Sequence, residues 1–350
     1  MKYDLIAPTS MGIRLSPQDR QPVGFGSQYT MYATSAESNV LNVSASLGLK
    51  TLVLTNFVKE SPIAAFIKGE LRRRNIAFEG PEIPQGGPWG FRHQFNIADA
   101  GFGPRGPKVH NDRAGEAGRL LKAGDFDLKR LFETDGIRLM HLSGLIAALS
   151  ESTAELCVQM AELAKRNGTL VSFDLNFRAS FWKGREEQLF KAFSRIAGLS
   201  DILIGNEEDF QLALGISGPK AEEGIAGETS AFRGMIDKAR ETFPNAKVFA
   251  TTLRQAMDAN RHLWGAILWK DGQWHEAPLR EIQVLDRIGG GDGFVGGLLY
   301  GLLKGWSGEK CVQFGWATGA LAVTMVEDYA SPPDEETVLR IWEGKARVLR

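Results

Sequence analysis

Cysteine is scarce in this 350-residue sequence: Cys157 and Cys311 are the only two, and they lie far apart without a CxxC pair. A disulfide framework is therefore excluded, and the five histidines show no spacing that would complete a zinc site. No apolar run reaches the roughly 18 residues that a membrane-spanning helix needs. The first apolar run is also too short for a secretory signal. We expect a soluble protein of the reducing cytoplasm, with no membrane partner.

An excess of charge of one sign is also missing. Lys and Arg number 41 and Asp and Glu 42, which gives a formal net charge of -1. Because no basic field exists to attract nucleic acid, an anionic substrate must be held by a local cluster. Hydrophobic residues make up 43% and charged residues 24% of the chain, which is ordinary usage for a globular protein with a substantial core.

Short apolar runs alternate with longer segments of helical periodicity. TLVLT (51–55) and TLVSFDL (169–175) are typical of strands, whereas 152–165 repeats apolar residues at helical spacing. This alternation predicts a parallel sheet covered by helices. Two Gly- and Pro-rich segments, at about 12–34 and 84–112, interrupt the pattern. We expect them to form a small β lid inserted in one domain that spans residues 1–350.

The segment LDRIGGGDGFVGG (285–297) places one carboxylate, Asp292, inside a run of glycines between a strand and a helix. Three interpretations are open. In the first, Asp292 only caps or precedes the first helical turn, a favourable place for an acid. In the second, GDGFVG is a dinucleotide fingerprint, although it lies near the C-terminus instead of opening a first βαβ unit. In the third, Asp292 is a general base beside an anion hole formed by the N–H groups of Gly289, Gly290 and Gly291.

DRIGGGDGF resembles the signature D-T-x-G-A-G-D-x-F of the ribokinase-like (phosphofructokinase-B) sugar kinases. Arg in the second position and three glycines are typical of the 2-keto-3-deoxygluconate kinases. The resemblance implies a ribokinase-like α/β fold, with a central, mostly parallel, twisted sheet, helices on both faces and a small β-strand lid. It also implies that Asp292 deprotonates the acceptor hydroxyl. The chain has no GxxxxGK[ST], which excludes a P-loop kinase by pattern.

Two further segments resemble substrate motifs of these kinases. DLNFR is similar to D-x-N-x-R, whose arginine meets the substrate carboxylate, and we expect Asp174, Asn176 and Arg178 on one side of an extended chain at the end of a strand. Arg113 matches a second arginine that holds the sugar acid. The alternatives are an Asp–Arg pair that braces a loop and, for Arg113, a solvated surface side chain.

The helix that begins near TSAESN (34–39) resembles a G-G-A-x-x-N motif, so the resemblance implies sugar contacts for Ser35 and Asn39. Thr and Ser replace its two glycines, and these side chains narrow the approach of a sugar to the backbone. Asp328 aligns with the aspartate of a P-G-D segment and is also expected at the substrate, although Val326 and Glu327 replace the Pro and Gly.

The nucleotide side is expected at two other strand ends. DILIGNEED resembles an N-x-x-E motif, which implies that Asn206 and Asp209 organise Mg²⁺ and the nucleotide phosphates. The alternative is that the acids of this segment interact only with the helix dipole. ATTLR resembles a strand-end TLR, which places Thr252 and Arg254 beside the nucleotide. The implied cofactors are ATP and Mg²⁺, and a monovalent cation is left open.

The sequence thus predicts an ATP-dependent kinase of a small sugar or sugar acid, with 2-keto-3-deoxygluconate, phosphorylated at its primary hydroxyl, as the first candidate. Another ketose, a hexose or keto-deoxygalactonate is the alternative substrate, because Ser35 and Asn111 depart from the motifs, Asn111 standing where an aromatic residue is usual. A catalytically retired sugar-binding relative is the alternative from another class. Nucleic acid is not expected as a partner, and a homo-oligomer is left open.

Overall fold

The computed structural model describes residues 1–219 and 229–345. Its main sheet has nine strands. In spatial order these are β15 (Gln273–Gln283), β14 (Arg261–Lys270), β13 (Val248–Ala256), β12 (Ile202–Ile204), β11 (Leu170–Asp174), β10 (Ile137–Ser143), β1 (Tyr3–Pro8), β4 (Thr51–Leu54) and β6 (Ile76–Glu79). Every pairing from β13 to β6 is parallel. Only β14 and β15 run antiparallel to their neighbours.

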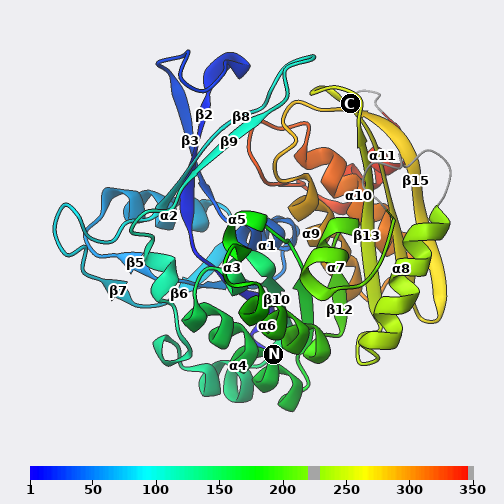
Figure 1. The fold of residues 1–350 in the computed structure, drawn as a ribbon, viewed down its shortest axis with the longest axis horizontal. Coiled ribbons are helices and arrows are strands. Elements are labelled where there is room, and N and C mark those ends of the chain that lie inside the picture. Colours follow the sequence, from blue (N-terminus) through cyan, green and yellow to red (C-terminus); the bar gives the residue numbers. More distant parts are fainter. Residues whose placement is uncertain (220–228, 346–350) are drawn as a thin grey trace.

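The helices cover both faces of this sheet (Figure 1). They are α1 (Ala36–Ser46), α2 (Pro62–Arg73), α3 (Gly144–Ala148), α4 (Glu151–Arg166), α5 (Ala179–Trp182), α6 (Glu186–Leu199), α7 (Glu207–Leu214), α8 (Thr229–Thr242), α9 (Gly290–Leu303), α10 (Gly308–Ala322) and α11 (Glu335–Trp342). Many begin at a side chain that accepts a hydrogen bond from a first-turn N–H group, as expected at a helix N-terminus: Ser35, Ser61, Ser143, Ser150, Asn206, Ser307 and Asp334.

The strands of the sheet interior are apolar on both faces because both faces are covered. In β1, Leu5 and Ala7 belong to a core shared with α1, α9 and α10, whereas Ile6 points into the opposite core with α4 and α6. This alternation follows from the two-residue period of a strand. The predicted α/β architecture, a mostly parallel sheet between two layers of helices, is confirmed (Figure 1).

The two Gly- and Pro-rich segments contribute a second sheet, here called the lid sheet. It consists of β3 (Tyr29–Thr34), β2 (Gly12–Pro17), β8 (Gln94–Asp99) and β9 (Lys108–Asp112), in that spatial order. It projects from the body beside the carboxyl ends of the parallel strands (Figure 1). A short parallel pair, β5 (Phe57–Val58) and β7 (Glu82–Ile83), lies apart from it. No helix in the described part of the chain is long and apolar enough to cross a membrane.

Candidate active site

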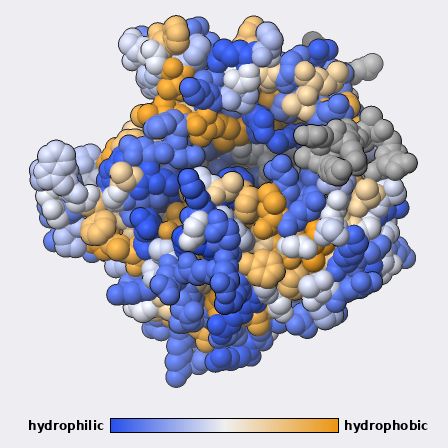
Figure 2. All heavy atoms as spheres, in the orientation of Figure 1, coloured by the Kyte–Doolittle hydropathy of each residue, from blue (hydrophilic) through white to orange (hydrophobic). Residues whose placement is uncertain are grey.

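A cavity of about 740 Å³ lies between the lid sheet and the carboxyl ends of the parallel strands. The surface is visibly hollowed at this place, and hydrophilic side chains border much of the hollow (Figure 2). Apart from Gly290, all of the residues that the sequence predicted for the site line this cavity: Ser35, Asn39, Arg113, Asp174, Asn176, Arg178, Asn206, Asp209, Thr252, Arg254, Gly289, Gly291, Asp292 and Asp328. The structure therefore brings together residues from nearly the whole length of the chain.

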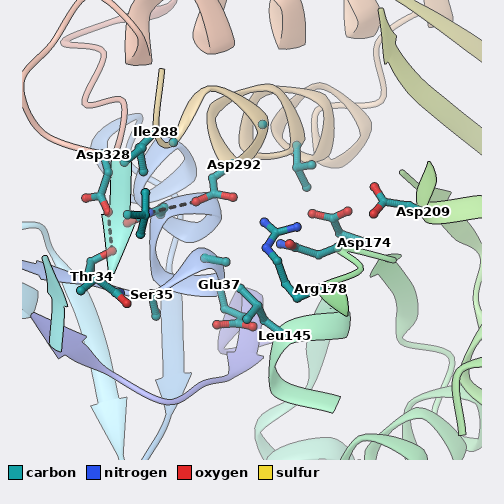
Figure 3. Close-up of a pocket in the computed structure, with 18 of the residues that line it drawn as sticks. Thr34, Ser35, Glu37, Leu145, Asp174, Arg178, Asp209, Ile288, Asp292 and Asp328 are labelled. Carbon is teal, nitrogen blue, oxygen red and sulfur yellow. Dashed lines mark hydrogen bonds between the residues drawn. The ribbon is translucent and has the colours of Figure 1, made fainter. Parts of the chain in front are cut away.

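Asp292 lies in the first turn of α9 and its carboxylate faces the cavity (Figure 3). Asn39 donates from Nδ2 to its Oδ2 at 2.9 Å. Burial raises the pKa of Asp292 well above its usual range, against the lowering effect of the Asn39 hydrogen bond, and the nearby carboxylates of Asp174 and Asp328 raise it further. Asp292 does not cap α9, since the N-cap is Gly289 and no side chain caps this helix, but it lies in the first turn, where an acid is favoured.

The glycines before Asp292 shape the start of α9. Gly289 is in the left-handed region, with φ 84°, and its carbonyl accepts from the N–H of Gly293 at 2.8 Å. A Cβ at Gly289 would come within 1.9 Å of the carbonyl oxygen of Asp328, so only glycine fits there. The N–H groups of a first helical turn have no intrahelical acceptor. The N–H groups at the start of α9 therefore lie near the Asp292 carboxylate without an intrahelical acceptor.

The glycines after Asp292 have a different role, which is to let helices approach. A Cβ at Gly296 would come within 2.7 Å of the carbonyl oxygen of Val40 in α1, and one at Gly297 within 2.0 Å of Oγ1 of Thr318 in α10. The last glycine of GDGFVG thus packs against a helix and does not face the cavity. The second glycine, Gly293, would have to approach the pyrophosphate in a dinucleotide fingerprint, but it packs against α10, where a Cβ would come within 2.8 Å of the carbonyl oxygen of Thr318, and it does not line the cavity. The dinucleotide interpretation therefore fails.

Asp174, Asn176 and Arg178 meet at the cavity, but not for the predicted reason. β11 ends at Asp174, and Asn176 has a φ of 37°, so the chain turns instead of staying extended. Asn is one of the residues that tolerate this conformation. Arg178 donates from Nη1 to the carbonyl of Phe177 at 2.7 Å and forms no ion pair with Asp174, so the loop-bracing pair is absent. Burial, followed by the charge of Asp209, raises the pKa of Asp174 to about 8.

Asn206 and Asp209 form a reciprocal cap at the start of α7. Oδ1 of Asn206 accepts from the N–H of Asp209 at 2.9 Å, and Oδ2 of Asp209 accepts from the N–H of Asn206 at 2.8 Å. Oδ1 of Asp209 also accepts from the N–H of Phe177 at 2.8 Å, which links α7 to the segment after β11. Both carboxylate oxygens are therefore engaged. The neighbouring Glu207 and Glu208 line the cavity with no side-chain hydrogen bond within residues 1–219 and 229–345.

The remaining predicted substrate residues are well anchored. Ser35 is the N-cap of α1 and accepts from the N–H of Ser38 at 3.1 Å. Arg113 is not a solvated surface residue, because its Nη1 donates to Oε1 of Glu116 at 2.7 Å. Asp328 is buried and accepts from Oγ1 of Thr34, while its second oxygen has no partner among the described residues (Figure 3).

Several residues that the sequence did not single out also line the cavity. Glu37, next to the predicted Ser35, is buried and accepts from Oγ1 of Thr9 at 2.6 Å and from Oγ of Ser143. Within the described part of the chain, unpartnered buried polar atoms of cavity residues are Arg14 Nε and Nη1, Asn39 Oδ1, Gln94 Oε1, Asn96 Oδ1, Arg113 Nε, Asn176 Oδ1, Trp264 Nε1 and Asp328 Oδ1. Buried polar atoms are rarely left without a partner, so this lining is suited to a polar ligand.

Comparison with known proteins identifies the class. Residues 133–335 match the family model of the pfkB family carbohydrate kinases, which is more than half of the chain. The chain therefore belongs to this family of phosphotransferases.

Similar proteins span the whole chain. A 2-dehydro-3-deoxygalactonokinase of Haloferax volcanii is 25% identical, over 97% of this chain and 98% of its own length. A 5-dehydro-2-deoxygluconokinase of Clostridium perfringens is 24% identical, over 98% of this chain and 92% of its own. The crystal structure of the 2-dehydro-3-deoxygluconokinase of Thermotoga maritima superimposes with a TM-score of 0.87 at 27% identity, and the match covers 98% of this chain and 99% of that one.

Proposed function

We propose that this carbohydrate kinase transfers the γ-phosphoryl group of ATP to the primary hydroxyl of a small sugar acid, with 2-keto-3-deoxygluconate as the first candidate. The observation that carries the proposal is the carboxylate of Asp292, which faces a polar cavity beside the N–H groups of Gly289, Gly290 and Gly291. A base and an anion hole in one loop are what phosphoryl transfer to an alcohol requires.

In this mechanism Asp292 takes the hydroxyl proton while the hydroxyl oxygen bonds to the γ-phosphorus and the bond to the β-phosphate oxygen breaks, which releases ADP. Asn39 holds one carboxylate oxygen through its Nδ2, which leaves the other oxygen for the proton. The raised pKa of Asp292 makes the carboxylate a stronger base once it is ionised. The glycine N–H groups stabilise the charge on the transferring group.

The substrate carboxylate is assigned to Arg113 and Arg178. Both line the cavity, and a guanidinium can hold a carboxylate through two parallel hydrogen bonds. Asn176 and Asp328 each present a buried oxygen without a partner in the described chain, which suits hydroxyl groups of the substrate. Asp174, whose pKa is about 8, is protonated at neutral pH and can donate a hydrogen bond.

ATP and Mg²⁺ fit the residues at the other side of the cavity. Thr252 and Arg254 at β13 and the amides before α9 are suited to phosphates. The described residues contain no group of three or more His, Cys, Asp or Glu that could hold a metal ion. Mg²⁺ commonly keeps several waters and binds through phosphates and one or two carboxylates. Glu207 and Glu208 would hold such a hydrated ion, and Asn206 and Asp209, which cap α7, would fix their position. The ion would neutralise phosphate charge.

A coupled ADP-release assay tests the proposal. We expect turnover with 2-keto-3-deoxygluconate and a loss of about 100- to 10,000-fold in Asp292→Asn, the usual contribution of a general base. Asp237→Asn on α8, an exposed acid paired with Arg240, is the control and should keep full turnover. Unchanged turnover in Asp292→Asn would exclude this mechanism.

A second substrate candidate is a different keto-deoxy sugar acid, such as the galactonate epimer. Asn111 lines the cavity where an aromatic residue is usual, and the hydroxyl of Ser35 is engaged in capping α1. The same assay, run with keto-deoxygluconate, keto-deoxygalactonate, 5-keto-2-deoxygluconate, ribose and fructose, ranks these by kcat/KM. Saturable sugar binding without ADP release from any of them would instead indicate a retired relative.

A further inference from the structure

Arg287 lies in the cavity next to the glycine loop that leads into α9. It lines the cavity, is half-buried, and directly precedes the loop of Ile288 and the glycines that leads into α9. Arg254, near the end of β13, lines the same cavity. Neither guanidinium forms an ion pair or hydrogen bond within the part of the chain that the structure describes.

Three other arginines of the cavity and lid pair with acids, whereas Arg178 donates only to the carbonyl of Phe177. Arg14 is paired with Asp286, Arg113 with Glu116 and Arg105 with Asp99. The acid next to Arg287 in the sequence, Asp286, is thus already engaged by Arg14. Arg287 and Arg254 therefore have no acid within ion-pair distance in the described part of the chain.

The two guanidinium groups are close enough to influence each other. Burial and then the positive charge of Arg287 lower the pKa of Arg254 to about 10, with Arg178 acting in the same direction and Glu207 and Glu208 opposing it. Both positive charges also act on His262: burial, followed by the charges of Arg254 and Arg287, lowers the pKa of His262 to about 4. At neutral pH His262 is therefore neutral and both arginines are charged. Like charges held together in this way favour the binding of an anion between them.

We infer that Arg287, together with Arg254, binds the phosphate chain of a nucleoside di- or triphosphate. The inference rests on the proposed function and adds to it a residue and a ligand group. Arg287 belongs to the same loop as the glycine N–H groups and lines the same cavity, so it can contact an anion held there. Arg113, in contrast, follows β9 of the lid sheet and stands at the sugar side. A planar guanidinium can contact two phosphate oxygens at once and stays charged as the leaving diphosphate gains negative charge.

Calorimetric titration with ADP, and with AMP for comparison, tests this role without any sugar. Arg287→Gln should weaken ADP binding by about 10- to 100-fold, the usual effect of losing a charge-assisted hydrogen bond, and should weaken AMP binding less. Arg287→Lys keeps the charge without the fork and should show an intermediate loss. Arg261→Gln on β14, an exposed arginine paired with Asp258, is the matched control and should bind ADP as the unmodified protein does.

The outcomes separate this inference from the proposed function. If Arg287→Gln binds ADP like the unmodified protein while the kinase assay works, the role of Arg287 is refuted and the function stands. If no sugar is phosphorylated but ADP binding depends on Arg287, the inference stands and the function is wrong. If Arg287→Gln does not fold, Arg287→Lys decides, because unchanged ADP binding in that variant, at low and at high salt, refutes a bidentate phosphate contact.

Discussion

The ion pair between Arg14 and Asp286 ties the lid sheet to the loop that carries the anion hole. Arg14 lies on β2 and its side chain is 1% exposed, while that of Asp286 is 4% exposed. The second oxygen of Asp286, Oδ1, accepts from the N–H of Ile288 at 3.0 Å. One carboxylate therefore holds the lid strand with one oxygen and shapes the glycine loop with the other.

Removing one partner of this pair leaves a buried charge without compensation, which costs about 3–5 kcal/mol. We expect a loss in this range for Arg14→Met and for Asp286→Asn, measured by chemical denaturation. If the two effects were independent, the double variant would lose about 6–10 kcal/mol. Because the double variant leaves neither charge unpaired, we expect a loss of no more than about 3 kcal/mol, since replacing a whole buried pair is often nearly neutral.

A matched control is available beside the same sheet. Arg92 pairs with Asp112, and the two side chains are 33% and 43% exposed, so Arg92→Met should cost about 1 kcal/mol or less. The reasoning about Arg14 and Asp286 is refuted if the double variant loses the sum of the two single losses. Turnover gives a second measurement: Arg14→Met should lower kcat, because the loop before Gly289 loses its anchor, whereas Arg92→Met should not.

Three further predictions concern the acids and the loop. Folding raises the pKa of Asp292, so the folded protein binds this proton more tightly than the unfolded chain and becomes less stable as the pH rises. Asp292→Asn should therefore raise the melting temperature at pH 7.5. A lower melting temperature in this variant would contradict the argument. The pKa of Asp174 is about 8 instead of 3.8, so the contribution of this residue to the stability of the folded state declines between about pH 4 and pH 8. In Asp174→Asn the melting temperature should therefore fall less across this pH range than in the unmodified protein. Gly289→Ala would force a Cβ to within 1.9 Å of the Asp328 carbonyl oxygen and should cost about 1–3 kcal/mol and about 100-fold in turnover, whereas Gly291→Ala, with nothing within 4 Å, should preserve stability.

Local patterns in the sequence were sufficient for the sheet and for the position of the main loop. The pattern of apolar and polar residues reports burial directly, so strands such as 51–55 and 169–175 and the helix over 152–165 could be located. Asp292 could be placed at a helix start because the glycines preceding it are a local signal. Asp174 and Arg178 were placed on one side by strand periodicity, yet the turn at Asn176, with φ 37°, is what brings them to the cavity.

Contacts between distant segments could not be obtained in this way. Arg14 and Asp286 are separated by 272 positions, and no periodicity within either segment indicates the other. The same holds for Glu37, whose hydroxyl partners Thr9 and Ser143 come from two different strand ends. The sequence also could not show that Arg287 lacks an ion-pair partner. Its neighbour in the sequence, Asp286, is an obvious candidate partner, but in the folded chain Asp286 pairs with Arg14.

The glycines around Asp292 explain why this acid has a raised pKa and why it lies at the cavity. Gly296 and Gly297 let α9 lie against α1 and α10 at backbone distance, and this close packing sets the helix N-terminus at the floor of the cavity instead of at the surface. The same burial removes water from the carboxylate and raises its pKa. A base with a raised pKa accepts a proton more readily, and the N–H groups at the helix start stabilise negative charge beside it. Packing that is unfavourable for an ionised acid in the resting protein is therefore what equips that acid to take a proton from an alcohol.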